Sequence, residues 1–171
     1  MSKTKKLAIA GILTALCTVF LFVGSLFQTL DLSTAAIGSI IVMIAFIELG
    51  KGWAFGIYAA SSLLSMLLLP NKTAAVVFTL FLGFYPIVKV PLNKIKPILL
   101  SYAARIAVFN LFLTALIYVA TVLIHIEEDY LGFGIVIYAM ANTAFILFDF
   151  ALERMAIYYN IKLRKFIFGR R

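Results

Sequence analysis

The sequence predicts an all-α integral membrane protein with six transmembrane helices, built as a single domain over 1–171. Hydrophobic residues make up 64% of the 171 residues and charged residues 13%, whereas a soluble domain is about half apolar and about a quarter charged. A helix needs roughly 17–25 apolar residues to cross the hydrocarbon core. Six such stretches use nearly the whole chain, at about 7–27, 32–49, 53–70, 73–90, 98–124 and 131–158.

The distribution of basic residues predicts that both termini lie in the cytoplasm. Twelve of the 15 Lys and Arg residues lie before the first span, at the end of the fourth, or after the second, fourth and sixth: Lys3, Lys5, Lys6, Lys51, Lys89, Lys94, Lys96, Lys162, Arg164, Lys165, Arg170 and Arg171. The joints after the first, third and fifth spans hold one basic residue, Lys72, against the acids Asp31, Glu127, Glu128 and Asp129. Cytoplasmic loops carry the Lys/Arg excess. The net charge of +8 then reflects orientation and attraction to anionic membrane lipids, and no nucleic-acid partner is expected.

The first span begins like a secretory signal, but it is expected to be a true transmembrane helix. Its 21 residues exceed the roughly 7–15 residues of a signal-peptide core. No enzyme motif, phosphate loop or cofactor signature follows along the chain. The single Cys17 and the single His125 beside outer acids make a weak ligand set, so neither a metal site nor a cofactor is expected.

Two prolines lie near the end of the fourth span, at Pro86 and Pro91. Each removes a backbone donor, and its ring clashes with the preceding helical turn. They are expected to kink or end that helix.

Two stripes of small residues occur at helical spacing. The first consists of Ala8, Gly11, Ala15 and Thr18, and the second of Gly52, Gly56 and Ala60. In a membrane, small residues let helices approach closely and associate by van der Waals contact. The stripes therefore serve either packing inside this chain or docking onto another membrane protein, and the first span is the stronger candidate for docking.

A charged cluster is expected at the cytoplasmic ends of the last two spans. Arg105 lies within the fifth span, and Asp149 and Glu153 lie one turn apart on the sixth. Charges at that depth usually face the bundle interior and pair, so Arg105 is expected to bridge to Asp149 or Glu153, with Lys89 near enough to join. The cluster is either an ion-pair lock between helices or a relay for protons or ions, and an inner-leaflet headgroup site is a further alternative.

An outward-facing ligand site would use polar residues at the opposite side and at mid-membrane. Asn71 and Lys72 lie at the tight turn between the third and fourth spans, Asn110 and Asn142 could form a floor, and Tyr138 could supply an aromatic wall. Amides offer both donors and acceptors to a polar ligand. The alternative is that the asparagines bond each other between helices and that the tyrosine belongs to the interfacial aromatic belt.

Three segments resemble the substrate-binding S-components of energy-coupling factor (ECF) vitamin transporters. They are 5–8 (KKLA), which leads into the small-residue first span, and 50–56 (GKGWAFG) with 61–65 (SSLLS), which are similar to the family's third helix. The family's six-helix bundle, with both termini inside, also matches the expected architecture.

The resemblance implies a multi-pass protein of the bacterial plasma membrane that binds a vitamin or another small polar molecule. It also implies two kinds of partner, a transmembrane coupling subunit and a pair of ATPases. In that family, small motifs in helices one and three dock onto the coupling subunit. Here those motifs are Gly11-xxx-Ala15, in place of the usual Ala-xxx-Ala, and Gly52-xxx-Gly56. Alternatives are a stand-alone secondary transporter, a lipid-headgroup flippase using the charged cluster, and a non-transporting accessory subunit.

Overall fold

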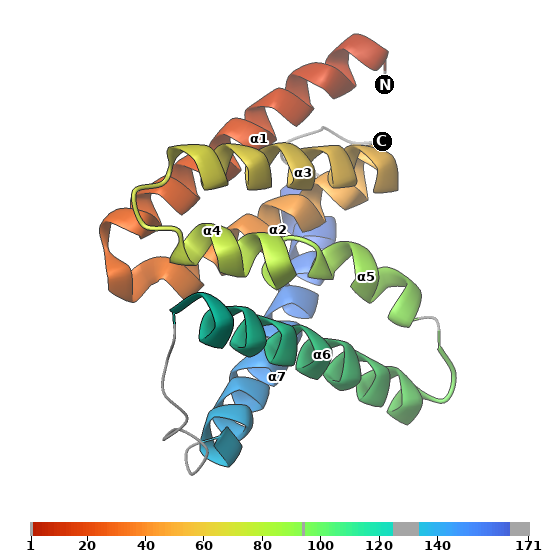
Figure 1. The fold of residues 1–171 in the computed structure, drawn as a ribbon. Helices are drawn as coiled ribbons and strands as arrows, with labels where there is room; N and C mark the ends of the chain where they lie inside the picture. The colour runs from red at the N-terminus through yellow and green to blue at the C-terminus, as the bar shows by residue number, and fades with distance from the viewer. Residues whose placement is uncertain (1, 94, 125–133, 165–171) are drawn as a thin grey trace. The chain divides into compact units, whose positions relative to one another are not determined.

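A computed structural model describes residues 2–93, 95–124 and 134–164, and all regular structure in these ranges is helical (Figure 1). Five helical stretches in this part of the chain are long and apolar enough to cross a membrane: Lys3–Leu26, Asp31–Leu49, Thr73–Leu92, Leu99–Tyr118 and Val136–Lys162. The chain is therefore an all-α protein with the character of a multi-pass membrane protein. The outer joint with His125 and Glu127–Asp129 lies outside the described residues, as do Lys94 and 165–171.

The third helix, α3, spans Lys51–Leu68 and occupies the predicted span 53–70, but it is not one of these five. Three serines lower its apolar character, and Ser61, Ser62 and Ser65 are all buried. A sixth membrane crossing therefore stays a prediction, and so does the cytoplasmic placement of the termini.

The chain forms two compact units, one from 1–90 with 155–171 and the other from 91–154. In the first unit, α1 (Lys3–Leu26), α2 (Asp31–Leu49) and α3 pack against one another, and α4 (Thr73–Val77) packs against all three (Figure 1). Cys17 and Leu21 of α1 are fully buried in this core. At Gly24, α1 approaches α2 so closely that an added Cβ would clash with the Thr34 side chain and lie 2.7 Å from its Cβ.

The joint between α2 and α3 consists of a single residue, Gly50. Its φ of +92° lies in a region that side-chain-bearing residues rarely adopt and that glycine enters without steric cost. Its N–H bonds to the carbonyl of Phe46 at 3.1 Å, and its carbonyl accepts from Ala54 N–H at 3.1 Å. The glycine thus ends one helix and begins the next, which explains why α2 and α3 need no longer loop.

The fourth span is interrupted, as the prolines predict, but the break lies upstream of Pro86. Helix α4 continues as a π-helix, η2 (Phe78–Leu82), and α5 begins at Tyr85 and ends at Leu92, one residue after Pro91. Pro86 has no N–H to give to the carbonyl four residues earlier and would clash with it. In the wider π-turn, Gly83 N–H bonds to the carbonyl of Phe78 at 2.8 Å.

The π-turn leaves the carbonyl of Thr79 without the N–H that an α-helix would supply. The hydroxyl of Tyr58 on α3 donates to this oxygen at 2.7 Å. A buried backbone carbonyl needs such a partner, so Tyr58 stabilises the interruption and ties α3 to the fourth span.

The second unit contains the antiparallel helices α6 (Ile98–Ile124) and the greater part of α7 (Gly134–Tyr158). Residues that contact each other across the two helices have increasing sequence positions on α6 and decreasing sequence positions on α7, as antiparallel helices require. Phe109 and Phe145 stack between them with ring centroids 4.4 Å apart and planes 4° from parallel. Helix α7 continues past Tyr158 as a π-helix, η4 (Tyr159–Leu163), which belongs to the first unit.

Candidate functional site

The small residues of α1 that were predicted to dock a partner lie on the outer face of the first unit. Gly11 and Ala15 are exposed, whereas Thr18 of the same stripe is buried, as is Cys17. A Cβ added at Gly11 would meet no atom within 4 Å. Large apolar side chains flank the stripe, including Ile12, which is 67% exposed. Within the described part of the chain, this face is therefore open to contact with lipid or with another protein.

The corresponding residues of α3 have the same placement. Gly52 and Gly56 are exposed, and a Cβ at either position would meet nothing within 4 Å. The opposite face of α3 is buried through Ile57, Ser61 and Ser65. The helix thus packs into its own unit through the serine face and leaves the glycine face open.

The two polar residues at the turn between α3 and α4 bond to the ends of these helices. Lys72 Nζ donates to the carbonyls of Met66 at 2.6 Å and Leu69 at 2.7 Å, which are near the end of α3. Asn71 Oδ1 accepts from the backbone N–H of Thr73 at 3.0 Å and from its hydroxyl at 2.8 Å. Both side chains therefore stabilise the turn itself, and a ligand would have to compete with these bonds.

The two asparagines predicted to form a ligand floor bond each other across α6 and α7. Asn110 Nδ2 donates to Asn142 Oδ1 at 3.0 Å, and Asn142 Nδ2 donates to Asn110 Oδ1 at 2.9 Å. Each amide also donates to the carbonyl one turn back, at Ile106 and Tyr138. All four amide hydrogens have partners, so ligand recognition by these groups would require the pair to open.

Tyr138 extends the same polar seam by one further step. Its hydroxyl lies 2.8 Å from the hydroxyl of Thr114 on α6. The hydroxyl of Thr114 also bonds to the carbonyl of Asn110 at 2.8 Å. The seam therefore runs continuously from the amide pair toward the α6–α7 joint.

The amide pair predicts a specific pattern of stability. Asn110→Leu should destabilise the unit by about 0.6–1.7 kcal/mol, the range of interhelical hydrogen bonds in membranes, because Asn142 loses a partner. The double variant N110L/N142L should recover most of that loss, since no amide is then left half-bonded. Thermal unfolding in detergent measures both. If both variants are as stable as wild type while ligand retention falls, the asparagines contact ligand and are not a packing device.

A buried ion pair in the second unit joins Arg105 and Asp149. Arg105 Nη1 lies 2.9 Å from Asp149 Oδ2, and the two side chains are only 6% and 7% exposed. Arg105 Nη2 also donates to Ser101 Oγ at 3.1 Å, and its guanidinium carbon lies 4.6 Å from the centre of the Tyr102 ring. The guanidinium is thus held by a carboxylate, a hydroxyl and an aromatic face.

The remaining members of the predicted charged cluster belong to different units. Glu153 is exposed on α7 in the second unit, and Lys89 is 6% exposed on α5 in the first. A four-residue cluster that includes them stays a prediction.

A second ion pair was not anticipated from the sequence. Glu48 near the end of α2 lies 3.0 Å, through Oε1, from Nε of Arg164, and its side chain is 8% exposed. Both residues belong to the first unit, which shows that the segment after Met155 returns to α2. The sequence does show an acidic residue at the end of an apolar span, which suggests an ion pair. It offers several basic residues as partners, however, so the pairing with Arg164 could not be predicted.

The described residues contain no group of three or more His, Cys, Asp and Glu side chains placed to hold a metal ion. No protein-family model, curated protein or solved structure significantly matches this chain.

Proposed function

We propose that this chain is a membrane-embedded substrate-binding subunit of an ECF-type nutrient transporter, with six spans and both termini in the cytoplasm of a bacterial cell. It binds a vitamin or another small polar molecule and has no catalytic role of its own. A transmembrane coupling subunit and a pair of ATPases supply the energy. The proposal starts from the sequence resemblance described above.

One structural observation supports it most strongly, namely the open glycine faces of α1 and α3. These helices pack against each other in one unit, yet Gly11, Gly52 and Gly56 meet no neighbour at the Cβ position. A glycine costs helix stability relative to alanine, so glycines whose Cβ position no described residue contacts call for another explanation. Close approach by a partner's helix supplies one.

The second candidate is a stand-alone transporter or flippase, which the buried Arg105–Asp149 pair favours. Charged residues inside membranes often mark ion or proton pathways. A structural lock is the simpler interpretation of that pair, because both groups are bonded and nearly inaccessible.

Affinity purification from native membranes in mild detergent tests the first proposal. A tagged chain should bring down two ATPase subunits and one further membrane protein in fixed ratio. A chain that purifies alone and accumulates solute in liposomes under an ion gradient would support the stand-alone transporter. A chain recovered with a larger complex that has no ATPase would be an accessory subunit.

A further inference from the structure

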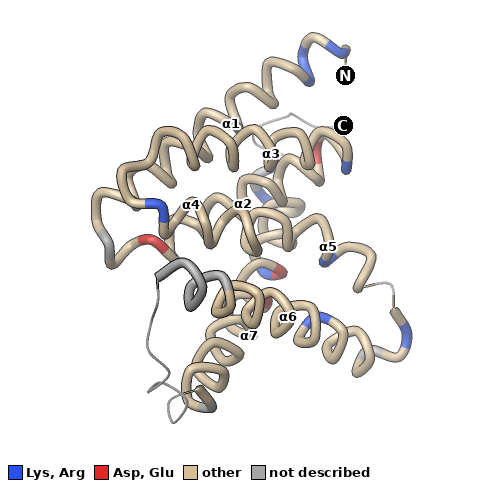
Figure 2. Tube along the Cα trace, viewed as in Figure 1, with Lys and Arg blue, Asp and Glu red and all other residues tan. Residues whose placement is uncertain are grey.

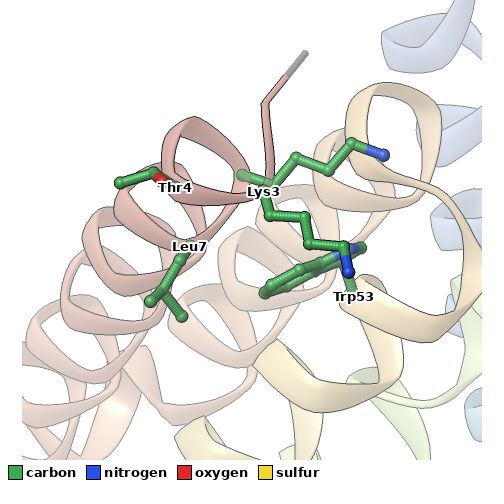
Figure 3. Close-up of a pocket in the computed structure, with 5 residues that line it drawn as sticks. Lys3, Thr4, Leu7 and Trp53 are labelled. Carbon is green, nitrogen blue, oxygen red and sulfur yellow. The ribbon is translucent and has the colours of Figure 1, made fainter.

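A hollow of about 480 Å³ lies between the first turns of α1 and α3. Lys3, Thr4, Lys6 and Leu7 of α1 and Trp53 of α3 line it (Figure 3). The two helices pack against each other within the first unit, so the hollow is defined inside a single compact part of the protein.

The positive charge around this hollow is unfavourable where it lies, at the N-terminus of α1. The first turn of α1 contains Lys3, Lys5 and Lys6 and no acidic residue, and the charges of α1 gather at this end (Figure 2). The N-terminus of a helix carries a partial positive charge, so acids stabilise it and lysines do not. Within the described ranges, Lys3 and Lys6 form no ion pair that would offset the repulsion. A bound anion would offset it.

The other lining residues indicate that the anion is part of an amphiphile. Lysine ammonium groups and a threonine hydroxyl are suitable donors to phosphate oxygens. Trp53 and Leu7 add an aromatic and an aliphatic wall, and tryptophan is enriched at the headgroup level of membranes. Beyond Leu7, large apolar side chains of α1 that flank the glycine stripe are exposed, with Ile12 at 67% and Leu16 at 44%. A phosphate in the hollow would therefore lie directly above a surface suited to acyl chains.

We propose that this hollow binds the phosphate of an anionic phospholipid, with Lys3 and Lys6 as the cationic contacts and Trp53 as the wall of the headgroup site. An acidic segment of a partner protein fits the charge but not the continuity between the hollow and the apolar face of α1. The proposal does not depend on the function proposed above, because lipid binding requires no coupling subunit.

Trp53 is the only tryptophan of the chain and reports directly on the hollow. Titrating the purified protein in neutral detergent with phosphatidylglycerol should change Trp53 fluorescence saturably, whereas phosphatidylcholine with the same acyl chains should not. K3Q/K6Q should weaken the phosphatidylglycerol response roughly tenfold or more, because two cations near an anionic headgroup are lost. The matched control K5Q/K51Q removes the same charge from exposed lysines that do not line the hollow and should stay within about twofold of wild type.

Four results would overturn the proposal. The first is an equal response to phosphatidylcholine, and the second is an equal loss in the two double variants, which would indicate general charge attraction. The third is saturation by inorganic phosphate alone at the same concentration, which would make the hollow a free-anion site. The fourth is a wild-type protein that responds to an acidic peptide but not to phosphatidylglycerol. Monodisperse elution of both variants in size-exclusion chromatography checks that they are folded.

Discussion

Replacing Arg105 with methionine is expected to destabilise the α6–α7 unit by about 3–5 kcal/mol, the usual cost of removing one partner from a buried ion pair. Asp149 would lose a guanidinium that lies 2.9 Å from its carboxylate while remaining buried. Ser101 would lose the donor that reaches its hydroxyl at 3.1 Å. Thermal unfolding in detergent, followed by circular dichroism, measures the effect.

The double variant R105M/D149L separates a structural lock from a relay. Apolar replacement of both partners in a buried pair is often neutral or stabilising, so the double variant should regain most of the stability that Arg105→Met loses. If the pair is a lock, the folded double variant should keep ligand binding and uptake. A relay predicts a stable double variant without uptake, and wild-type stability in Arg105→Met would show that the buried pair does not stabilise the hairpin.

Replacing both Gly11 and Gly56 with leucine is expected to abolish the association with the coupling subunit while leaving the chain folded. A Cβ at either position would meet no atom within 4 Å, so the first side-chain atom of each leucine has room inside the chain. They would hold a partner's helix away from both stripes, where close approach supplies the contact energy. Pull-down from native membranes should recover the ATPases at less than about a tenth of the wild-type yield, since each 1.4 kcal/mol lost is tenfold in affinity.

Gly134 offers a matched control for this pair. It begins α7 and likewise has nothing within 4 Å of a Cβ position, but it lies on neither α1 nor α3. Gly134→Leu should leave both the fold and the association unchanged. An equal loss of partners in Gly134→Leu would mean that the variants act through membrane insertion and not through docking.

The all-helical class of the protein could be predicted because each long helix appears in the sequence as a continuous run of apolar residues. The apolar runs 32–49 and 98–124 correspond to α2 at Asp31–Leu49 and α6 at Ile98–Ile124. The break in the fourth span could also be predicted from the sequence, because a proline disrupts the helical turn before it. The π-turn at the break could not be predicted, since it depends on a hydrogen bond from Tyr58 of another helix to the released carbonyl of Thr79.

The pairing of side chains was harder to predict from the sequence than the positions of the helices. Depth alone placed Arg105 near both Asp149 and Glu153, and only helix rotation determines that Asp149 is buried and Glu153 exposed. The hollow at Lys3, Lys6 and Trp53 was missed for a related reason. The sequence shows the lysines as part of a basic joint, and it does not show which of them face α3.

Site-specific photocrosslinking in native membranes tests the docking of α1 and α3 most directly. A photoreactive amino acid at position 11 or 56 should give a covalent adduct with one membrane protein, the same protein at both positions, and a crosslinker at position 134 should give none. Adducts with lipid alone at positions 11 and 56 would contradict the account, because the open glycine faces would then be lipid-facing surfaces and not a docking site.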